Sequence, residues 1–149
     1  MSVPNKRLPT SRLQELDEAI HNRRLEYSNV TGELYQGSAP PPGAAVSKHF
    51  KALVLMAAEY QPEVREFPGV QVFRAGIHDS KLTSMELNKA REAAAWVVKR
   101  LNDGDRVLVT CNAGLNRSGL VSALALVEMG YPAQRIIHHI RDIRGPRAL

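Results

Sequence analysis

The single cysteine of this 149-residue chain stands where a thiol could act as a nucleophile. In the stretch VLVTCNAGLNRSG, residues 107–119, Cys111 comes six positions before Arg117, and Ser118 directly follows the arginine. A guanidinium group can hold two phosphate oxygens at once, and a thiolate is favoured near cations and helix N-termini. A thiolate beneath a bound phosphoryl group can attack phosphorus in line, and a neighbouring hydroxyl can assist the sulfur when it later leaves. The competing interpretation of a lone cysteine is a small buried hydrophobe.

The residues between the cysteine and the arginine have the composition of an anion-binding loop. They are Asn112, Ala113, Gly114, Leu115 and Asn116. Successive backbone N–H groups can form a concave nest for an anion, and the N-terminus of a following helix adds partial positive charge. The glycine permits a backbone conformation that a side chain would oppose. We therefore predict that residues 112–117, including the arginine, bind phosphate.

This loop requires a strand before it and a helix after it, and the hydrophobic pattern predicts both, over 106–110 and 117–129. Further predicted elements are strands at 33–37, 51–57 and 70–75 and helices at 10–26, 83–104 and 133–144. Thr83 and Glu86 form a capping box at the start of one helix. The alternation predicts a single α/β domain over 1–149, with 1–9 flexible and a central, mostly parallel or mixed sheet of four to five strands flanked by helices. Ligands of such sheets bind at the carboxyl ends of strands, where the cysteine lies.

Composition narrows the setting in which the chain works. The formal net charge of +5 favours anionic partners, although no aromatic residues alternate with basic ones as in proteins that stack bases. No apolar run of about 18 residues and no signal-peptide pattern is present. One cysteine cannot form an internal disulfide. We expect an intracellular, cytoplasmic protein that does not contact membranes, and nothing in the sequence indicates an oligomeric state.

The stretch VLVTCNAGLNRSGLVSALALVEMG resembles the signature of the cysteine-dependent dual-specificity phosphatases, within the protein tyrosine phosphatase superfamily. GELYQGSAP, FKALVLMAAEY and RIIHHIRDIRGPRAL resemble the family's early strand, a later strand and its late helix, so the resemblance covers about residues 30–149. It implies the tyrosine-phosphatase fold and hydrolysis of phosphotyrosine, phosphoserine and phosphothreonine in protein substrates. The reaction would pass through a phosphocysteine on Cys111, without cofactor or metal. Arg117 would hold the phosphoryl group and Ser118 would assist breakdown of the intermediate.

The family mechanism also needs a general acid on a separate loop. Asp79 in AGIHDSKL follows the predicted strand at 70–75 and precedes the cysteine by 32 positions, a spacing similar to that of the family. We therefore predict that this aspartate protonates the leaving group. Two alternatives stay open: the aspartate caps the following helix, or the neighbouring His78 takes the catalytic role.

Two features depart from the family pattern. Thr110 stands where the family has a histidine that orders the loop and activates the thiol, and we expect the threonine to hydrogen-bond the loop instead. The chain stops at Leu149, where the family continues with an asparagine–proline pair and a last helix.

Other substrates define the alternatives to a protein phosphatase. The loop lacks the basic residues that phosphoinositide-directed relatives carry, so lipids rank lower. Asn116 directly before the arginine is similar to the loop of the RNA 5′-triphosphatase branch, which makes an RNA 5′-phosphatase the second hypothesis. A phosphate-binding scaffold without turnover is the third, although the cysteine, arginine, serine and aspartate are all present.

Overall fold

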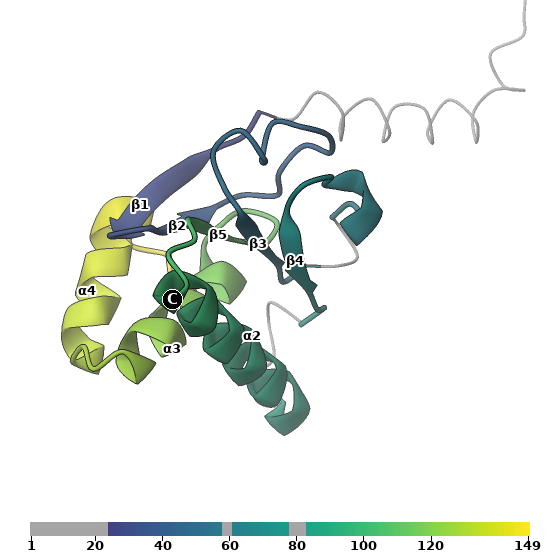
Figure 1. Cartoon of the computed structure of the whole chain (residues 1–149). Coiled ribbons are helices and arrows are strands. Elements are labelled where there is room, and N and C mark those ends of the chain that lie inside the picture. The colour runs from purple at the N-terminus through teal and green to yellow at the C-terminus, as the bar shows by residue number, and fades with distance from the viewer. Residues whose placement is uncertain (1–23, 58–60, 78–82) are drawn as a thin grey trace, which may run out of the picture.

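A five-stranded mixed sheet organises the computed structural model, which describes residues 24–57, 61–77 and 83–149 (Figure 1). In chain order the strands are β1 (Tyr27–Thr31), β2 (Leu34–Gly37), β3 (Ala52–Leu55), β4 (Gln71–Arg74) and β5 (Val107–Thr110). Their spatial order is β1-β2-β5-β3-β4. The β1–β2 pair is antiparallel and the other neighbouring pairs are parallel. The predicted α/β class and mixed sheet are thereby confirmed.

The helices lie close to their predicted bounds. They are α2 (Ser84–Asn102), α3 (Asn116–Glu128) and α4 (Ala133–Arg144), with a short 3₁₀ helix, η3 (Val64–Glu66). The capping box of α2 is present, because the Glu86 N–H donates to Thr83 Oγ1 at 3.2 Å and the Thr83 N–H donates to Glu86 Oε1 at 3.2 Å. Two backbone donors of the first turn are thus satisfied, which fixes where this helix begins.

The structure before β2 differs from the one predicted from the sequence. Residues 24–26, the end of the helix predicted over 10–26, have no regular secondary structure, and 10–23 lie outside the described residues, as do 1–9. Strand β1 was not predicted. It turns back through Gly32, whose φ is +54°, onto β2. The Asn29 side chain donates to the carbonyls of Gly32 (2.9 Å) and Leu34 (3.2 Å), so an asparagine of low strand propensity stabilises the turn.

Apolar side chains cover both faces of the central strands β3 and β5. On one face the sheet packs against α2, α3 and α4, which lie on the same side of it in Figure 1. On the other face, Leu53, Leu55 and Leu108 pack with Val46, Phe50 and Phe67 from the connecting segments. Burial on both faces explains why these strands are continuous apolar runs in the sequence.

Strand register brings several chain segments to one edge of the sheet. Thr110 at the end of β5 is paired with Gly37 at the end of β2 and with Leu55 at the end of β3, and Leu55 is paired with Arg74 at the end of β4. The residues that follow these four strands therefore leave the sheet side by side, and this edge is where a ligand site is expected.

No helix in the described ranges has both the length and the apolar character needed to cross a membrane.

Candidate functional site

Residues 111–115 connect β5 to α3 at the carboxyl edge of the sheet and surround a cavity of about 80 Å³. The cavity is lined by Cys111, Asn112, Ala113, Leu115, Asn116 and Arg117. Cys111 is only 2% exposed, whereas the side chains at 112, 113 and 116 are exposed and form the rim. The structure thus brings the predicted nucleophile and all but one of the predicted phosphate-binding residues to one small concave site.

The carbonyl groups of this loop all bind partners outside it. The Cys111 carbonyl accepts from Gln61 Nε2 (3.4 Å) and the Asn112 carbonyl from the Ala39 N–H (3.1 Å). Arg144 donates to the next two carbonyls, from Nη2 to that of Ala113 (3.4 Å) and from Nε to that of Gly114 (2.9 Å). Gln36 Nε2 donates to the carbonyls of Gly114 (3.0 Å) and Leu115 (3.4 Å). A trans peptide points its C=O and the next N–H in opposite directions. The N–H groups of 112–116 are therefore turned away from these partners.

The N–H groups that face the cavity are available to donate hydrogen bonds. Among the described residues, none of the N–H groups of 112–115 donates a hydrogen bond. The N-cap of α3, Leu115, makes no side-chain capping bond, so the first turn of that helix is not blocked by its own cap. Aligned backbone donors and the positive end of a helix together form an anion site.

Gly114 is the predicted loop residue that does not line the cavity. Its φ is +75°, in the left-handed region that favours glycine. A Cβ at this position would lie 2.3 Å from Arg144 Nη2 and 2.5 Å from the carbonyl carbon of Gly37. The glycine therefore lets the loop pack closely on the end of β2 and on α4, which supports the loop from behind.

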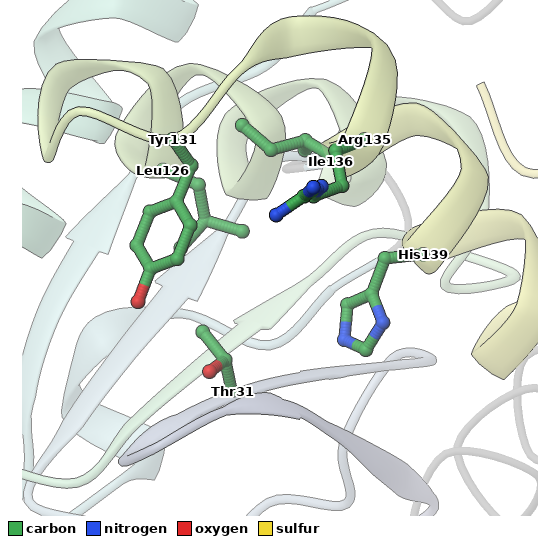
Figure 2. Close-up of a pocket in the computed structure, with 6 residues that line it drawn as sticks. All are labelled: Thr31, Leu126, Tyr131, Arg135, Ile136 and His139. Carbon is green, nitrogen blue, oxygen red and sulfur yellow. The ribbon is translucent and has the colours of Figure 1, made fainter.

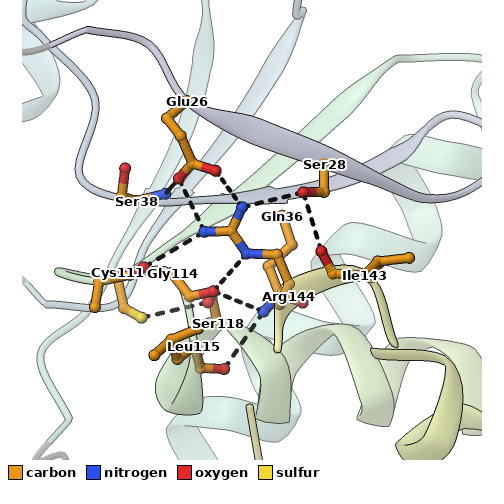
Figure 3. Close-up of polar contacts among 11 residues, drawn as sticks. Glu26, Ser28, Gln36, Ser38, Cys111, Gly114, Leu115, Ser118, Ile143 and Arg144 are labelled. Atoms are coloured by element: carbon orange, nitrogen blue, oxygen red, sulfur yellow. Dashed lines mark hydrogen bonds and ion pairs between the residues drawn. The ribbon is translucent and has the colours of Figure 1, made fainter. Parts of the chain in front are cut away.

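The thiol lies beside a buried hydroxyl. Cys111 Sγ and Ser118 Oγ are 3.3 Å apart, within hydrogen-bond distance, and Ser118 is fully buried in the first turn of α3 (Figure 3). A hydroxyl placed this way can donate to a thiolate and stabilise its charge.

Arg117 comes from the same turn and is 6% exposed. Its Nη1 donates to the carbonyl of Ile77 at 3.1 Å. Ile77 follows β4 and is the last described residue before the predicted acid, since His78 and Asp79 lie outside the described residues. The arginine therefore connects the start of α3 to Ile77, two positions before Asp79 in the sequence.

Thr110 does not bond the loop as expected. Its Oγ1 donates to the Val54 carbonyl on β3 (2.7 Å) and accepts from Gln61 Nε2 (2.9 Å), while Gln61 Oε1 accepts from the Ala57 N–H (2.8 Å). The threonine thus joins β5 to β3, and its link to the loop runs through Gln61, which also donates to the Cys111 carbonyl.

Arg144, the last residue of α4, supports the loop and was not predicted from the sequence. Besides the two loop carbonyls it donates to Ser28 Oγ (3.2 Å) and pairs with both oxygens of Glu26, Nη2 to Oε1 at 2.9 Å (Figure 3). Its side chain is 6% exposed. Hydrogen bonding from Arg144 lowers the pKa of Glu26 despite partial burial, and its positive charge acts in the same direction. One guanidinium group therefore joins α4, the start of β1 and the loop of residues 111–115.

Gln36 on β2 is a second support that sequence reasoning missed. It is fully buried and donates to two loop carbonyls, while its Oε1 has no hydrogen-bond partner among the described residues. The available signal in the sequence was a glutamine in the middle of a predicted strand. If such a side chain is buried, it needs a polar partner elsewhere in the fold.

No protein-family model and no curated protein matches this sequence. Solved structures do. A mouse protein solved as a candidate dual specificity phosphatase, complexed with zinc tungstate, shares 24% identity over 86% of this chain and 80% of its own, with a TM-score of 0.72. Human DUSP28 shares 23% identity over 81% and 85%, with a TM-score of 0.69. PTPMT1 in complex with PI(5)P shares 19% over 79% and 83%, with a TM-score of 0.66.

These similarities extend over most of the described chain and over most of each solved structure. At such sequence identities they establish the architecture: the α/β fold is that of the protein tyrosine phosphatases.

Proposed function

We propose that this chain is a cysteine-dependent phosphatase that hydrolyses phosphotyrosine, phosphoserine and phosphothreonine esters of proteins. One observation carries the proposal: a buried thiol lies at a cavity whose loop carbonyls all accept hydrogen bonds from outside the loop, so the loop N–H groups are available to bind an anion. The phosphatase names of the structural neighbours support it, and so does the tungstate oxyanion complexed with the mouse protein.

In the first proposed step the Cys111 thiolate attacks phosphorus. An S–P bond forms as the P–O bond to the leaving oxygen breaks, and that oxygen takes a proton from Asp79. The N–H groups of 112–116 and the guanidinium group of Arg117 hold the three non-bridging oxygens, over which the negative charge of the transition state is spread. The role of the aspartate rests on its spacing and on its nearness in sequence to Ile77, which Arg117 contacts.

In the second step a water molecule attacks phosphorus and gives a proton to the Asp79 carboxylate. The S–P bond breaks, inorganic phosphate forms, and the sulfur leaves as a thiolate that accepts a hydrogen bond from the Ser118 hydroxyl. The 3.3 Å contact between the two side chains supports this role. The two steps balance without a redox partner.

The small size of the cavity and its exposed lining residues support the proposed substrate class. Within the described residues the cavity of about 80 Å³ is lined by the loop and the first turn of α3 alone, and three of its lining residues are exposed. A site without deep walls would admit both short and long phosphorylated side chains, which is why we include phosphoserine and phosphothreonine with phosphotyrosine.

The proposal is tested with Cys111→Ser on a small aryl phosphate in EDTA. We expect turnover to fall at least about a thousandfold, as when a covalent nucleophile is removed, while tungstate binding, measured by calorimetry, persists. Turnover like that of the wild type would contradict the phosphocysteine mechanism. Tungstate binding with an inactive wild-type protein would instead indicate the phosphate-binding scaffold.

The substrate is tested by competition among three classes. Phosphopeptides carrying each phosphorylated residue are compared with 5′-triphosphorylated RNA and with vesicles containing PI(5)P, the lipid bound to PTPMT1. We expect the phosphopeptides to be turned over fastest. Turnover of RNA alone would favour the RNA 5′-phosphatase, and turnover of the vesicles alone would favour a lipid phosphatase.

A further inference from the structure

A second cavity lies between β1 and the corner where α3 leads into α4. Its volume is about 210 Å³ and it is lined by Thr31, Leu126, Tyr131, Arg135, Ile136 and His139 (Figure 2). The proposed phosphate loop, residues 111–115, is at the other end of α3. Arg117 of the first cavity and Leu126 of the second are nine residues apart on this helix, or about 14 Å at 1.5 Å per residue. The cavity is therefore distinct from the candidate catalytic site.

The walls of this cavity are mostly apolar, and exposed apolar residues lie near its lining residues in the sequence. Leu126 and Ile136 are buried, whereas Tyr131 at the opening is 47% exposed. Val127 and Met129, in the same turn of chain, are 46% and 43% exposed. Of the six large hydrophobic residues that are exposed in the described ranges, three thus fall within 127–131. Such a concentration marks a binding surface better than the isolated exposed residues elsewhere.

Arg135 is the charged side chain that lines the cavity, beside His139. No carboxylate of the described residues lines it, and Glu128 in the adjoining turn does not reach it. The His139 ring is held by the Val30 carbonyl and forms a fixed wall. The Arg135 guanidinium group extends between Tyr131 and His139 in Figure 2 and makes no ion pair with any described residue. An anionic group placed over the cavity would pair with it.

We propose that this cavity is a docking site for an acidic peptide segment of a partner protein, which inserts one bulky apolar side chain between Leu126 and Ile136. A volume of about 210 Å³ suits one large side chain. Tyrosine and arginine beside an apolar pocket are the residues that contribute most to the affinity of peptide interfaces. A small cavity beside one arginine favours a peptide over a membrane surface, which would need a broad basic face. The docking site does not depend on the proposed phosphatase activity.

Binding is measured by fluorescence polarisation with an unphosphorylated, fluorescein-labelled heptapeptide that has a central phenylalanine flanked by three aspartates on each side. Two matched peptides replace the phenylalanine with alanine or the aspartates with lysines. We expect each replacement to weaken binding about tenfold or more, because burial of one aromatic side chain and one charged pair each contribute on that scale. Tungstate, which would occupy the phosphate loop, should not displace the peptide.

Variants locate the binding. Tyr131→Ala and Arg135→Glu should each weaken binding about tenfold, while Arg91→Glu, an exposed arginine on α2, should have no effect. All three changes are at exposed positions, and thermal unfolding verifies that the variants are folded. Equal affinity for all variants, displacement by tungstate, absence of peptide binding, or binding only to phosphatidylserine vesicles would each overturn the proposal.

Discussion

Ser118 and Cys111 are seven positions apart in the chain and 3.3 Å apart in the fold, because the loop returns the chain to the end of β5 as α3 begins. The hydroxyl is too buried to contact substrate directly. Its proposed contribution is to the second step, when sulfur leaves phosphorus and regains negative charge. This role is separable from nucleophilic attack, so the two steps should respond differently to its removal.

Ser118→Ala should slow breakdown of the intermediate more than its formation. We expect kcat to fall about tenfold or more, since one hydrogen bond to a developing charge is lost, with a burst of the released alcohol in rapid-mixing kinetics. Ser122→Ala is the matched control, one turn later on α3. Its hydroxyl is buried without a hydrogen-bond partner in the described chain, so kcat should not change. Equal losses in both variants would assign Ser118 a packing role only.

The absence of a side chain at Gly114 lets the loop pack closely against Arg144 and Gly37. Gly114→Ala would place a methyl group 2.3 Å from Arg144 Nη2 in a left-handed backbone. We expect a loss of stability of about 2 kcal/mol or more and at least tenfold weaker tungstate binding. Gly104→Ala isolates the backbone term, because Gly104 has φ +87° and nothing within 4 Å of the added atom. It should cost about 1 kcal/mol in chemical denaturation and leave tungstate binding unchanged.

The residues of the cavity were predictable and its supports were not. Cys111 to Arg117 form one local pattern, so residue types and spacing were enough to predict that these residues lie together. Gln36 and Gly114 are separated by 78 positions, Gln61 and Thr110 by 49, and Glu26 and Arg144 by 118. No local pattern reports such pairs, because they depend on which strands become neighbours.

Among the elements, α4 acts on the loop through its last residue. Arg144 is in the last turn, where a cation is expected to complement the helix dipole at the surface. Instead the side chain is buried and joins two loop carbonyls to Glu26. A lysine carries the same charge but has no planar fork to reach several acceptors. The arrangement therefore depends on arginine and on the carboxylate that offsets its charge.

The Glu26–Arg144 pair predicts a pH-dependent stability. Because the pKa of Glu26 is lowered on folding, its contribution is complete above the unfolded value of about 4.5 and is lost as the pH falls through the folded value. The difference in unfolding free energy between wild type and Glu26→Gln should therefore be largest near neutral pH and should narrow below about 4.5. A difference that does not vary from about pH 7 to about pH 3 would contradict this linkage.

Glu33→Gln is the control for that experiment. It removes a well-exposed ion pair with Arg106 and should change the unfolding free energy by less than about 1 kcal/mol at neutral pH.

Arg144→Lys tests the support of the loop by α4. The lysine keeps the positive charge but lacks the planar guanidinium fork, so tungstate binding should weaken about tenfold. Unchanged tungstate affinity in Arg144→Lys would show that the loop keeps its shape without the arginine.

Helices and central strands were well predicted from the sequence, whereas β1 was not. The central strands are apolar runs, and α2 carries a capping box, so the local signal was strong in both cases. Strand β1 has the sequence YSNVT, in which only Val30 is buried. An edge strand of this kind is held by its partner and by the Asn29 turn contacts, which propensity does not report.

In the whole molecule, parallel strands bring separate segments to one edge. The segment after β4 and the loop after β5 lie on either side of β3, and Arg117 bridges them through the Ile77 carbonyl. Alternating strands and helices predicted the sheet class, but not which strand lies next to which. The proposed acid role of Asp79 depends on that neighbour order, because the segment after β4 and the loop after β5 leave the same edge of the sheet.

Asp79→Asn tests this convergence. The amide cannot supply a proton, so hydrolysis of an unactivated alkyl phosphate should slow about a hundredfold or more, whereas an ester with a good leaving group should be affected much less. Asp142→Asn, at an exposed position on α4, is the control and should have no effect. Equal rates for wild type and Asp79→Asn on both esters would move the acid role elsewhere, with His78→Ala the next variant to measure.

Detection of the phosphocysteine itself separates covalent catalysis from every alternative. Ser118→Ala is mixed with a phosphopeptide, quenched in acid within milliseconds, digested and analysed by mass spectrometry. We predict a phosphoryl group on the peptide that contains Cys111, which appears with the burst and disappears as substrate is exhausted. Sustained phosphate release with no phosphoryl group on Cys111 at any quench time would contradict the mechanism.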